Sequence, residues 1–456
     1  MSDQAQSTLT INAPAMPKGG GAIQSIGKGW SGVGTTGAAA LDLPLPISKA
    51  PNRDLVPALG LGYSSDVGNS PFGIGWRLTS NAITLRTHKG VPKYDGDDQV
   101  LGPGGDVWMP EKHDDGSLVV RTAHEYNGVP LPGHQVIRYW PRVEGAFDLV
   151  EHWTQLEDSD NPAGFWLIHG ADGSLHCYGK TAASRRADAN DPSHVAAWLL
   201  DESLNLRGEH VVYLYQPEVE APVTPQYRDY RSQRYLRRVL YGNAQASANL
   251  YAWKADGWKD VAWHFHLLFD YGERSAELTQ VPIYDLPGIE RGDWGAPRQD
   301  AFWNFAFGFE LGCRRLCRQV LMFHQFPEAL GSEPVLVQRL LLEHRQTAQG
   351  YTQLTAAHLQ AYDNQGQTES RPPMEFYYSP FKRDPERQAY REFAQLPALN
   401  DGQRFQLVDL YGEGMPGVLF TSDKAWYYRE PLRAERGGDE VKYGEWALLP
   451  GTPVTD

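Results

Sequence analysis

The 456-residue sequence contains only three cysteines, at positions 177, 313 and 317. Such widely spaced thiols cannot form the disulfide framework that small secreted domains use in place of a large core. A chain of this length can bury a sizeable apolar core without cross-links. We therefore expect a fold that forms in a reducing cytoplasm, with later export left open.

Long apolar runs are also missing. The sequence has no stretch of about 18 apolar residues, the length that a membrane-spanning helix requires. The segment "MSDQAQSTLTINAPAMPKGGG" lacks the basic and apolar regions of a secretory signal. We expect neither direct membrane insertion nor a Sec signal.

Positive charge is scarce, with 42 Lys and Arg residues against 56 Asp and Glu residues and a formal net charge of −14. Nucleic acids and anionic membranes are bound by neutralising phosphates, so we expect neither as a partner. The one dense basic run is "RSQRYLRR", residues 231 to 238. On a strand, Arg234 and Arg238 would share a face and Arg237 would take the other, which favours separate ion pairs over a basic stripe.

Established catalytic motifs are absent as well. The sequence contains no G-x-S-x-G, no H-E-x-x-H and no P-loop.

His264 and His266 share a face of a predicted strand and would need a third ligand to hold a metal, so packing explains them better. Cys313 and Cys317 have apolar neighbours and no histidine partner, which favours structural thiols. We predict no catalytic residue, no metal and no cofactor.

One Gly-rich loop, "DLYGEGMPG", resembles the calcium loops of some propeller blades. Calcium takes roughly six to eight oxygen ligands, whereas this loop carries only two carboxylates, so we predict a tight turn. The loop residues are Asp409, Gly412, Gly414 and Gly417. The same argument makes the acidic stretch "YDGDDQ", residues 94 to 99, a solvated turn.

Glycine (46 residues) and proline (32 residues) recur between short runs of alternating apolar residues. This pattern is typical of many short strands joined by turns, so we predict an all-β fold of multi-stranded antiparallel sheets. Two prolines in "LDLPLPI", residues 41 to 47, remove backbone donors and predict an edge strand. Other strands are predicted within residues 58–65, 81–90, 165–179, 210–216, 234–243, 263–273, 333–344 and 374–380.

The stretch "NSPFGIGWRL", residues 69 to 78, contains no acid, base or nucleophile that suggests catalysis. Glycine permits a positive φ or a close approach by another group, and the aromatic rings can then fold into the core. We predict a structural turn between consecutive strands. Its residues are Pro71, Phe72, Gly73, Gly75 and Trp76.

Composition divides the chain into four parts. We expect a flexible Gly-rich leader at 1–29, a β domain at 30–380, a polar linker at 381–400 and the incomplete start of a β-propeller at 401–456. The last part has the size of one blade, and one blade cannot bury its own apolar face. We therefore expect the chain to stop inside a larger architecture.

Long segments resemble a known family. The run "PKGGGAIQSIGKGWSGVGTTGAAALDLPLPIS", residues 17 to 48, and "LGLGYSSDVGNSPFGIGWRLTSNAITLRTHKGVPKYDGDDQVL", residues 59 to 101, are similar to the amino-terminal domain shared by the Salmonella virulence protein SpvB and the B component of insecticidal Tc toxins. Later segments such as "FGFELGCRRLCRQVLMFHQF" agree in order, and residues 405 to 432 resemble the first propeller blade of the Tc B component.

The resemblance implies a secreted toxin component that leaves the bacterium by a non-Sec route. It implies a shell around a cytotoxic polypeptide, with the toxin C component and, through the propeller, the pore-forming A component as partners. SpvB also carries an ADP-ribosyltransferase marked by an E-x-E loop, but the one clear E-x-E here, at residues 218 to 220, lies within the β domain. An export domain for such an enzyme, a host glycan- or receptor-binding module and a hidden enzyme remain as alternatives.

Overall fold

A computed structural model of the chain describes residues 38–49, 54–79, 82–156, 161–218, 228–254, 256–284, 294–363, 367–379, 402, 404–412, 414–422, 424–432 and 442–451. The chain divides into two compact units, Met1–Tyr377 and Tyr378–Asp456. The predicted leader, residues 1–29, and the predicted linker, residues 381–400, lie outside the described residues.

Eight strands of the first unit close into a ring by antiparallel pairing. The order is β13, β4, β5, β6, β8, β9, β10 and β11, and β11 pairs again with β13. The ring strands are β4 (Ala82–Leu85), β5 (Val100–Leu101), β6 (Val107–Pro110), β8 (Val129–Pro141), β9 (Leu149–Gln155), β10 (Phe165–His169), β11 (Leu175–Tyr178) and β13 (Val195–Leu204). Two further strands, β7 (Val120–Tyr126) and β12 (Arg185–Ala187), pair with β8 and β13.

Strand β13 belongs both to the ring and to a second, open sheet. It pairs with β4 through Ala197–Leu199 and with β14 through Glu202–Leu204. All ten of its residues are buried. A strand covered on both faces is expected to be mostly apolar, and its buried polar groups need partners: Glu202 Oε1 lies 2.6 Å from His210 Nδ1.

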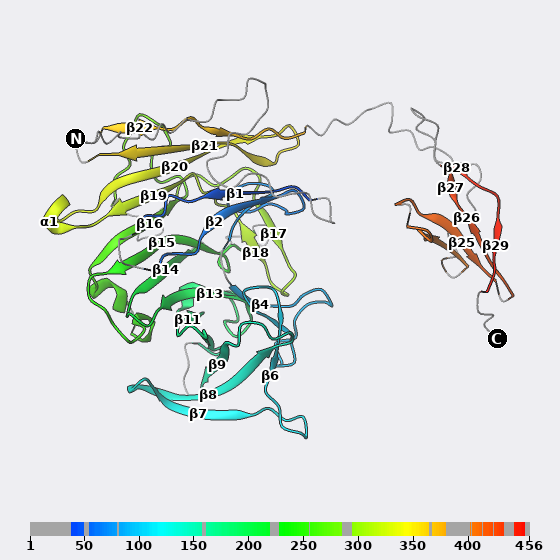
Figure 1. Cartoon of the computed structure of the whole chain (residues 1–456), viewed down its shortest axis with the longest axis horizontal. Coiled ribbons are helices and arrows are strands. Elements are labelled where there is room, and N and C mark those ends of the chain that lie inside the picture. The colour runs from blue at the N-terminus through cyan, green and yellow to red at the C-terminus, as the bar shows by residue number, and fades with distance from the viewer. Residues whose placement is uncertain are drawn as a thin grey trace, which may run out of the picture. The chain divides into compact units, whose positions relative to one another are not determined.

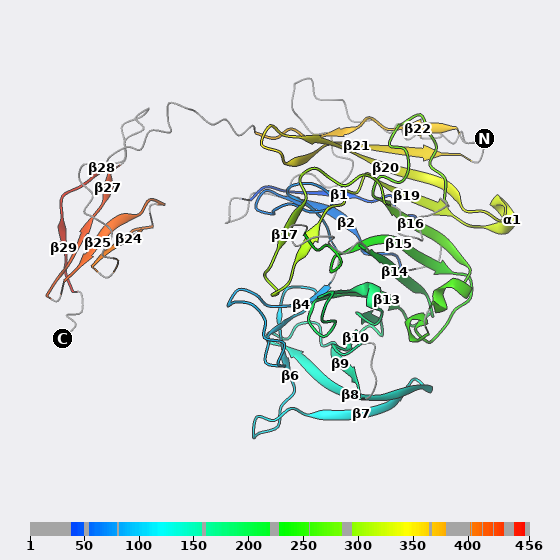
Figure 2. The same ribbon diagram turned by 180° about the vertical axis from the view of Figure 1, so that it is seen from behind.

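The open sheet continues from β13 as a ladder of long antiparallel strands. Figures 1 and 2 show this ladder with the ring at one end. Its strands are β14 (His210–Pro217), β15 (Arg234–Asn243), β16 (Trp263–Asp270), β19 (Gln319–His324), β20 (Val335–Gln346) and β21 (Thr352–Tyr362), with the short β22 (Thr368–Ser370) and β23 (Met374–Glu375) paired to β21.

A small sheet of β1 (Ala40–Pro44), β2 (Gly60–Ser64) and β3 (Trp76–Leu78) packs on the ladder. The segment that follows β1 is fixed there because Tyr241 of β15 donates its hydroxyl to Ser48 O at 2.8 Å. Among the described strands β1 pairs with β2 alone, so the predicted edge strand is confirmed. The hairpin of β17 (Phe302–Asn304) and β18 (Leu311–Cys313) forms a separate pair.

Aromatic side chains from several ring strands meet around Trp166 of β10. Its ring centroid lies 5.8 Å from Trp108, 4.8 Å from Tyr139, 4.3 Å from His152 and 5.9 Å from Trp198. These residues come from β6, β8, β9 and β13, so one aromatic cluster joins strands that are far apart in the sequence. The ring is therefore filled by packed side chains.

Helical structure is limited to single turns in the part of the chain that is described. These are the 3-10 helices η1 (Ala182–Ser184), η2 (Tyr251–Trp253) and η3 (Gly257–Asp260) and the helix α1 (Pro327–Leu330). The prediction of an all-β fold with antiparallel sheets is confirmed. Two predicted strands are shorter than expected: residues 81–90 contain only β4, and residues 374–380 contain only β23.

The second unit contains a four-stranded antiparallel sheet. Its order is β24 (Phe405–Val408), β25 (Gly417–Thr421), β26 (Trp426–Arg429) and β29 (Ala447–Leu449), beside a pair formed by β27 (Pro431–Leu432) and β28 (Lys442–Tyr443). Val418 and Tyr428 are buried in this sheet. Its assignment to a propeller blade stays a prediction.

Candidate functional site

The turn from Pro71 to Trp76 connects β2 with β3 and is buried within the first unit. Phe72 is 4% exposed and Trp76 is 1% exposed. Backbone hydrogen bonds fix the turn to distant segments: Ile74 N–H donates to Thr352 O at 2.9 Å, and Cys317 N–H donates to Pro71 O at 2.7 Å. The turn is therefore bonded to the first residue of β21 and to the segment just before β19.

The two glycines of the turn have positive φ angles, +101° at Gly73 and +79° at Gly75. Non-glycine residues rarely adopt such angles. Space is also restricted, because a Cβ atom at Gly75 would lie 2.5 Å from the ring of Tyr63. The glycine at position 75 was expected to let another group approach the backbone closely, and that group is the ring of Tyr63.

The aromatic rings of the turn contact different segments of the first unit. Trp76 lies 4.9 Å from Phe376, near the end of the unit, and 5.4 Å from Tyr63 of β2. Phe72 meets Phe269 of β16 edge to face at 6.5 Å. Contacts of this kind add to the free energy gained from burial. Their role in stability is a prediction for experiment.

An ion pair secures the start of the turn. Arg298 donates to both carboxylate oxygens of Asp300, at 2.8 and 2.9 Å, and also to Ser70 O. Burial alone would raise the pKa of Asp300, but hydrogen bonds from Arg298, Thr352 and Asn69 hold that pKa well below its usual value. The site is thus a structural junction with a paired charge beside it.

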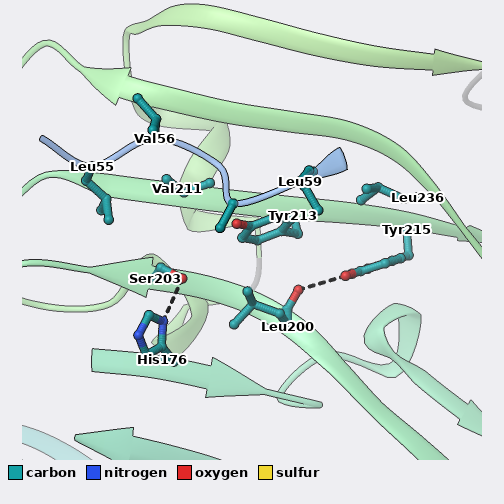
Figure 3. Close-up of a pocket in the computed structure, with 11 residues that line it drawn as sticks. Leu55, Val56, Leu59, His176, Leu200, Ser203, Val211, Tyr213, Tyr215 and Leu236 are labelled. Carbon is teal, nitrogen blue, oxygen red and sulfur yellow. Dashed lines mark hydrogen bonds between the residues drawn. The ribbon is translucent and has the colours of Figure 1, made fainter. Parts of the chain in front are cut away.

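A small pocket of about 100 Å³ lies between the segment before β2 and the strands β11, β13, β14 and β15. Figure 3 shows Leu55, Val56 and Leu59 from that segment and Tyr213 and Ser203 from the facing strands. Most of its lining is apolar, and the volume leaves room for only a few water molecules.

The pocket contains a serine–histidine pair that sequence analysis missed. His176 Nδ1 lies 2.8 Å from Ser203 Oγ, because β11 and β13 place the two residues directly opposite each other. A nucleophile beside a base is the arrangement of acyl transfer. Burial, however, lowers the pKa of His176, against the opposing effect of Asp172 and Asp148, and weakens the ring as a base. The pair resembles a satisfied buried contact more than a catalytic dyad.

The two histidines of "WHFHLL" have partners within the fold. His264 stacks on Phe326 at 4.6 Å, and His266 Nδ1 lies 2.7 Å from the Tyr284 hydroxyl. Burial lowers the pKa of His266 to about 4. Among the described residues no group of three or more His, Cys, Asp or Glu side chains could hold a metal ion.

All three cysteines are buried as free thiols. Burial raises the pKa of Cys177, Cys313 and Cys317, so the arginines that flank the last two do not activate them. A buried thiol with a raised pKa reacts slowly, which fits a packing role.

The acidic loops form turns in the described residues. Asp409 Oδ2 accepts the N–H of Gly414 at 2.8 Å, and Gly412 and Gly414 have φ angles of +74° and +79°. Gly417 begins β25, where a Cβ atom would lie 2.4 Å from Arg429 O. Glu413 lies outside the described residues. In "YDGDDQ", Asp98 accepts the backbone N–H groups of residues 93 and 94.

Among the described residues, the basic run forms ion pairs at two of its four arginines. Arg231 pairs with Asp229 and Arg237 pairs with Glu273, at 2.7 and 2.6 Å. By contrast, Arg234 donates to backbone carbonyl groups. The remaining arginine, Arg238, lies 4.9 Å from the Tyr284 ring centre. The expected ion pairs are thus present at Arg231 and Arg237, while carbonyl oxygens and an aromatic face contact the other two cations. A register shift beside Arg237 also interrupts the regular alternation.

Glu218, the first residue of the E-x-E sequence, is buried in an ion pair. It contacts Arg315 at 2.6 Å and Arg314 at 3.0 Å. Residues 219 and 220 lie outside the described residues.

No helix in the described part of the chain is long and apolar enough to cross a membrane.

Residues 33–326 match the model of the family described as SpvB: Salmonella virulence plasmid 65kDa B protein. The chain belongs to the SpvB family. The resemblance predicted from the sequence is thus confirmed, and it places the chain among virulence and toxin proteins.

SpvB-family relatives from Salmonella are similar over most of this chain. Mono(ADP-ribosyl)transferase SpvB from Salmonella typhimurium (strain 14028s / SGSC 2262) and from Salmonella dublin are each 42% identical over 361 residues, which are 78% of this chain. The match spans 58% of the length of each relative. The solved N-terminal domain of effector protein SpvB from Salmonella typhimurium strain LT2 superposes with a TM-score of 0.64 and 42% identity, covering 71% of this chain and 99% of that domain.

Tc toxin structures are similar over almost the whole SpvB-family chain. The crystal structure of TcdB2-TccC3 matches with a TM-score of 0.77 and 36% identity, covering 97% of this chain and 21% of that one. The Photorhabdus luminescens Tc holotoxin pore matches with a TM-score of 0.79 and 36% identity, covering 99% of this chain and 20% of that one. Because these two matches cover 97% and 99% of this chain, they include the second unit as well as the first.

Proposed function

We propose that this SpvB-family chain is a non-enzymatic structural and interaction domain of a secreted bacterial toxin. In this proposal it forms part of the shell that encloses and delivers a cytotoxic polypeptide. The single observation that carries the proposal is the match of 97% of the chain to TcdB2-TccC3 at 36% identity. The extended ladder joined to an aromatic-filled ring supports a role as a rigid wall.

The partners we propose are a toxin C component and, through a propeller, a pore-forming A component. One face of the four-stranded sheet supports the propeller assignment. Phe405, Phe420 and Trp446 lie on it within 6.3 Å of one another, while Leu407 and Leu448 are 52% and 59% exposed. Such an apolar sheet face requires a covering layer, which a neighbouring blade would supply.

The experiment that tests the shell proposal is an exchange of segments. This chain replaces the segment that it matches, 21% of the chain in the TcdB2-TccC3 structure, and the chimera is purified beside unaltered TcdB2-TccC3. We expect a stable complex in which a protease cleaves TccC3 no faster than it does in unaltered TcdB2-TccC3. A chimera that is folded by circular dichroism and yet leaves TccC3 unbound would overturn the proposal.

A second candidate is the amino-terminal export or delivery part of an SpvB-like mono(ADP-ribosyl)transferase. The 42% identity to proteins of that name, over 58% of their length, favours it. In both candidates the chain itself is not an enzyme and leaves the bacterium by a non-Sec route. Incubation with labelled NAD and a host-cell lysate, with full-length SpvB as the positive control, should leave host proteins unlabelled. Label transferred by the chain alone would contradict a non-enzymatic role.

A further inference from the structure

The segment before β2, residues 54–59, forms a roof over one face of the ladder (Figure 3). Glu209 holds the start of this roof. Its Oε2 atom accepts the backbone N–H groups of Asp54 and Leu55, at 3.3 and 3.2 Å, and a side-chain N–H of Asn205 at 2.8 Å. Asp54 also pairs with Arg207 at 2.9 Å. These contacts tie the roof to the turn between β13 and β14.

The cavity of about 100 Å³ beneath this roof is lined mainly by apolar side chains. The roof contributes Leu55, Val56 and Leu59, and the strands contribute Leu200, Val211 and Leu236. No lysine, arginine, aspartate or glutamate lines the cavity. It therefore offers no ionic partner to a charged ligand, and burying a charge there would be strongly unfavourable.

The polar groups of the lining contact one another or the backbone. His176 Nδ1 lies 2.8 Å from Ser203 Oγ, and the Tyr215 hydroxyl donates to Leu200 O at 3.0 Å. Burial raises the pKa of Tyr213, and a hydrogen bond with Ser203 opposes that rise.

These contacts leave little in the cavity that could hold a water molecule. Within the described residues, the buried side-chain nitrogen and oxygen atoms that lack a hydrogen-bond partner all lie outside its lining. A buried water needs roughly two to four polar partners. The lining thus suits an apolar occupant better than water.

We propose that this cavity is a binding site for a small, uncharged, apolar molecule. In another protein, an engineered apolar cavity of about 150 Å³ stays dry and binds benzene or xenon. An occupant gains dispersion contacts with lining atoms that otherwise face a void. The cavity of this chain is smaller, so xenon is the first probe to use. Nothing in the shell or delivery proposals requires this site, so it stands or falls independently of them.

The test observes isotope-labelled leucine and valine methyl groups of the full chain by NMR under increasing xenon pressure. We expect the methyl resonances of the lining leucines and valines to shift and to saturate as the pressure rises. The methyl groups of Leu118, which is 41% exposed and lies outside the lining, are the internal control and should show no saturable shift.

Two substitutions at Leu59 change the cavity in opposite directions. Leu59→Ala enlarges the cavity, so xenon should saturate the shifts at a lower pressure and benzene should also bind. Leu59→Phe fills the cavity and should abolish the saturable shifts. Leu118→Ala is the matched control variant and should bind xenon as the wild type does.

Two results would overturn the proposal. One is a wild-type chain whose lining methyl groups show no saturable shift under xenon. The other is equal xenon binding by the wild type and Leu59→Phe. If Leu59→Phe does not fold, as judged by circular dichroism, Val56→Leu takes its place in this comparison, because it adds a smaller group to the same roof and should weaken binding.

Discussion

Arg339 donates its Nε–H to the side-chain oxygen of Gln319 at 2.6 Å, and neither residue is exposed to solvent. Three backbone carbonyl groups from residues 275 to 280 accept its other N–H groups. No carboxylate of the described residues pairs with this arginine. Its charge is therefore balanced by dipoles, which join the ladder to the chain segment that follows β16.

Arg339→Met should strongly destabilise the fold. The methionine fills much of the space but removes the N–H groups that Gln319 Oε1 and three part-buried carbonyl oxygens accept. We expect the free energy of unfolding to fall by about 3 kcal/mol or more. Urea denaturation measures the change, with the exposed Arg345→Met as control. Equal stability of the two variants would show that the Arg339 hydrogen bonds contribute little.

Trp76→Ala should destabilise the first unit by about 3 to 5 kcal/mol, because it leaves a cavity beside Phe376 and Tyr63. The control is Trp140→Ala. Because Trp140 is 45% exposed, this substitution removes less buried apolar surface than Trp76→Ala. Thermal unfolding monitored by circular dichroism reports both. An unchanged melting temperature for Trp76→Ala would contradict the structural role of the turn.

Gly75→Ala tests the backbone of the same turn without removing an aromatic ring. The positive φ and the approach to Tyr63 both oppose a Cβ atom, so we expect a loss of at least about 2 kcal/mol. Gly68→Ala is the matched control, because a Cβ atom there would meet no atom within 4 Å. If both variants lose the same stability, the conformation of Gly75 is not the cause.

Buried histidines predict a loss of stability in acid. Burial lowers the pKa of His152, His266 and His344 to about 4, whereas an unperturbed histidine titrates at 6.5. The unfolded chain therefore binds more protons than the folded chain between these values, and the free energy of unfolding decreases as the pH falls from 6.5 to about 4. Asp201 opposes this in part, because burial raises its pKa to about 6.

Urea denaturation at a series of pH values from 7.5 to 4.5 measures this dependence. His266→Gln should reduce the slope, since one of the rings that take up a proton on unfolding is removed. A wild-type stability that stays constant over this range would show that the three rings are not held neutral by the fold.

The three thiols should react only when the structure opens. Cys177, Cys313 and Cys317 are buried and their pKa values are raised, so few thiolates are available to a thiol reagent at neutral pH. We expect labelling of the native chain to be slow and labelling in urea to be rapid. Fast labelling of the native chain at any one position would indicate an accessible thiol there.

Much of the local structure was predictable from local patterns. The glycines at 73 and 75 fix the backbone of the turn because few other residues tolerate their φ angles. The alternation in "LDLPLPI" and its prolines indicated an edge strand, and β1 is one. The strand predicted over residues 374–380 was too long, because pairing with β21 ends at Glu375. Propensity alone cannot locate that end.

By itself the sequence determined the all-β class and the family, since these depend on neighbouring residues and on similarity along the chain. Only the tertiary structure decided that β4 and β11 both pair with β13 to close a ring and that Ser203 faces His176. These relationships join residues that lie far apart in the chain. Register and long-range packing set them, and neither leaves a local signal in the sequence.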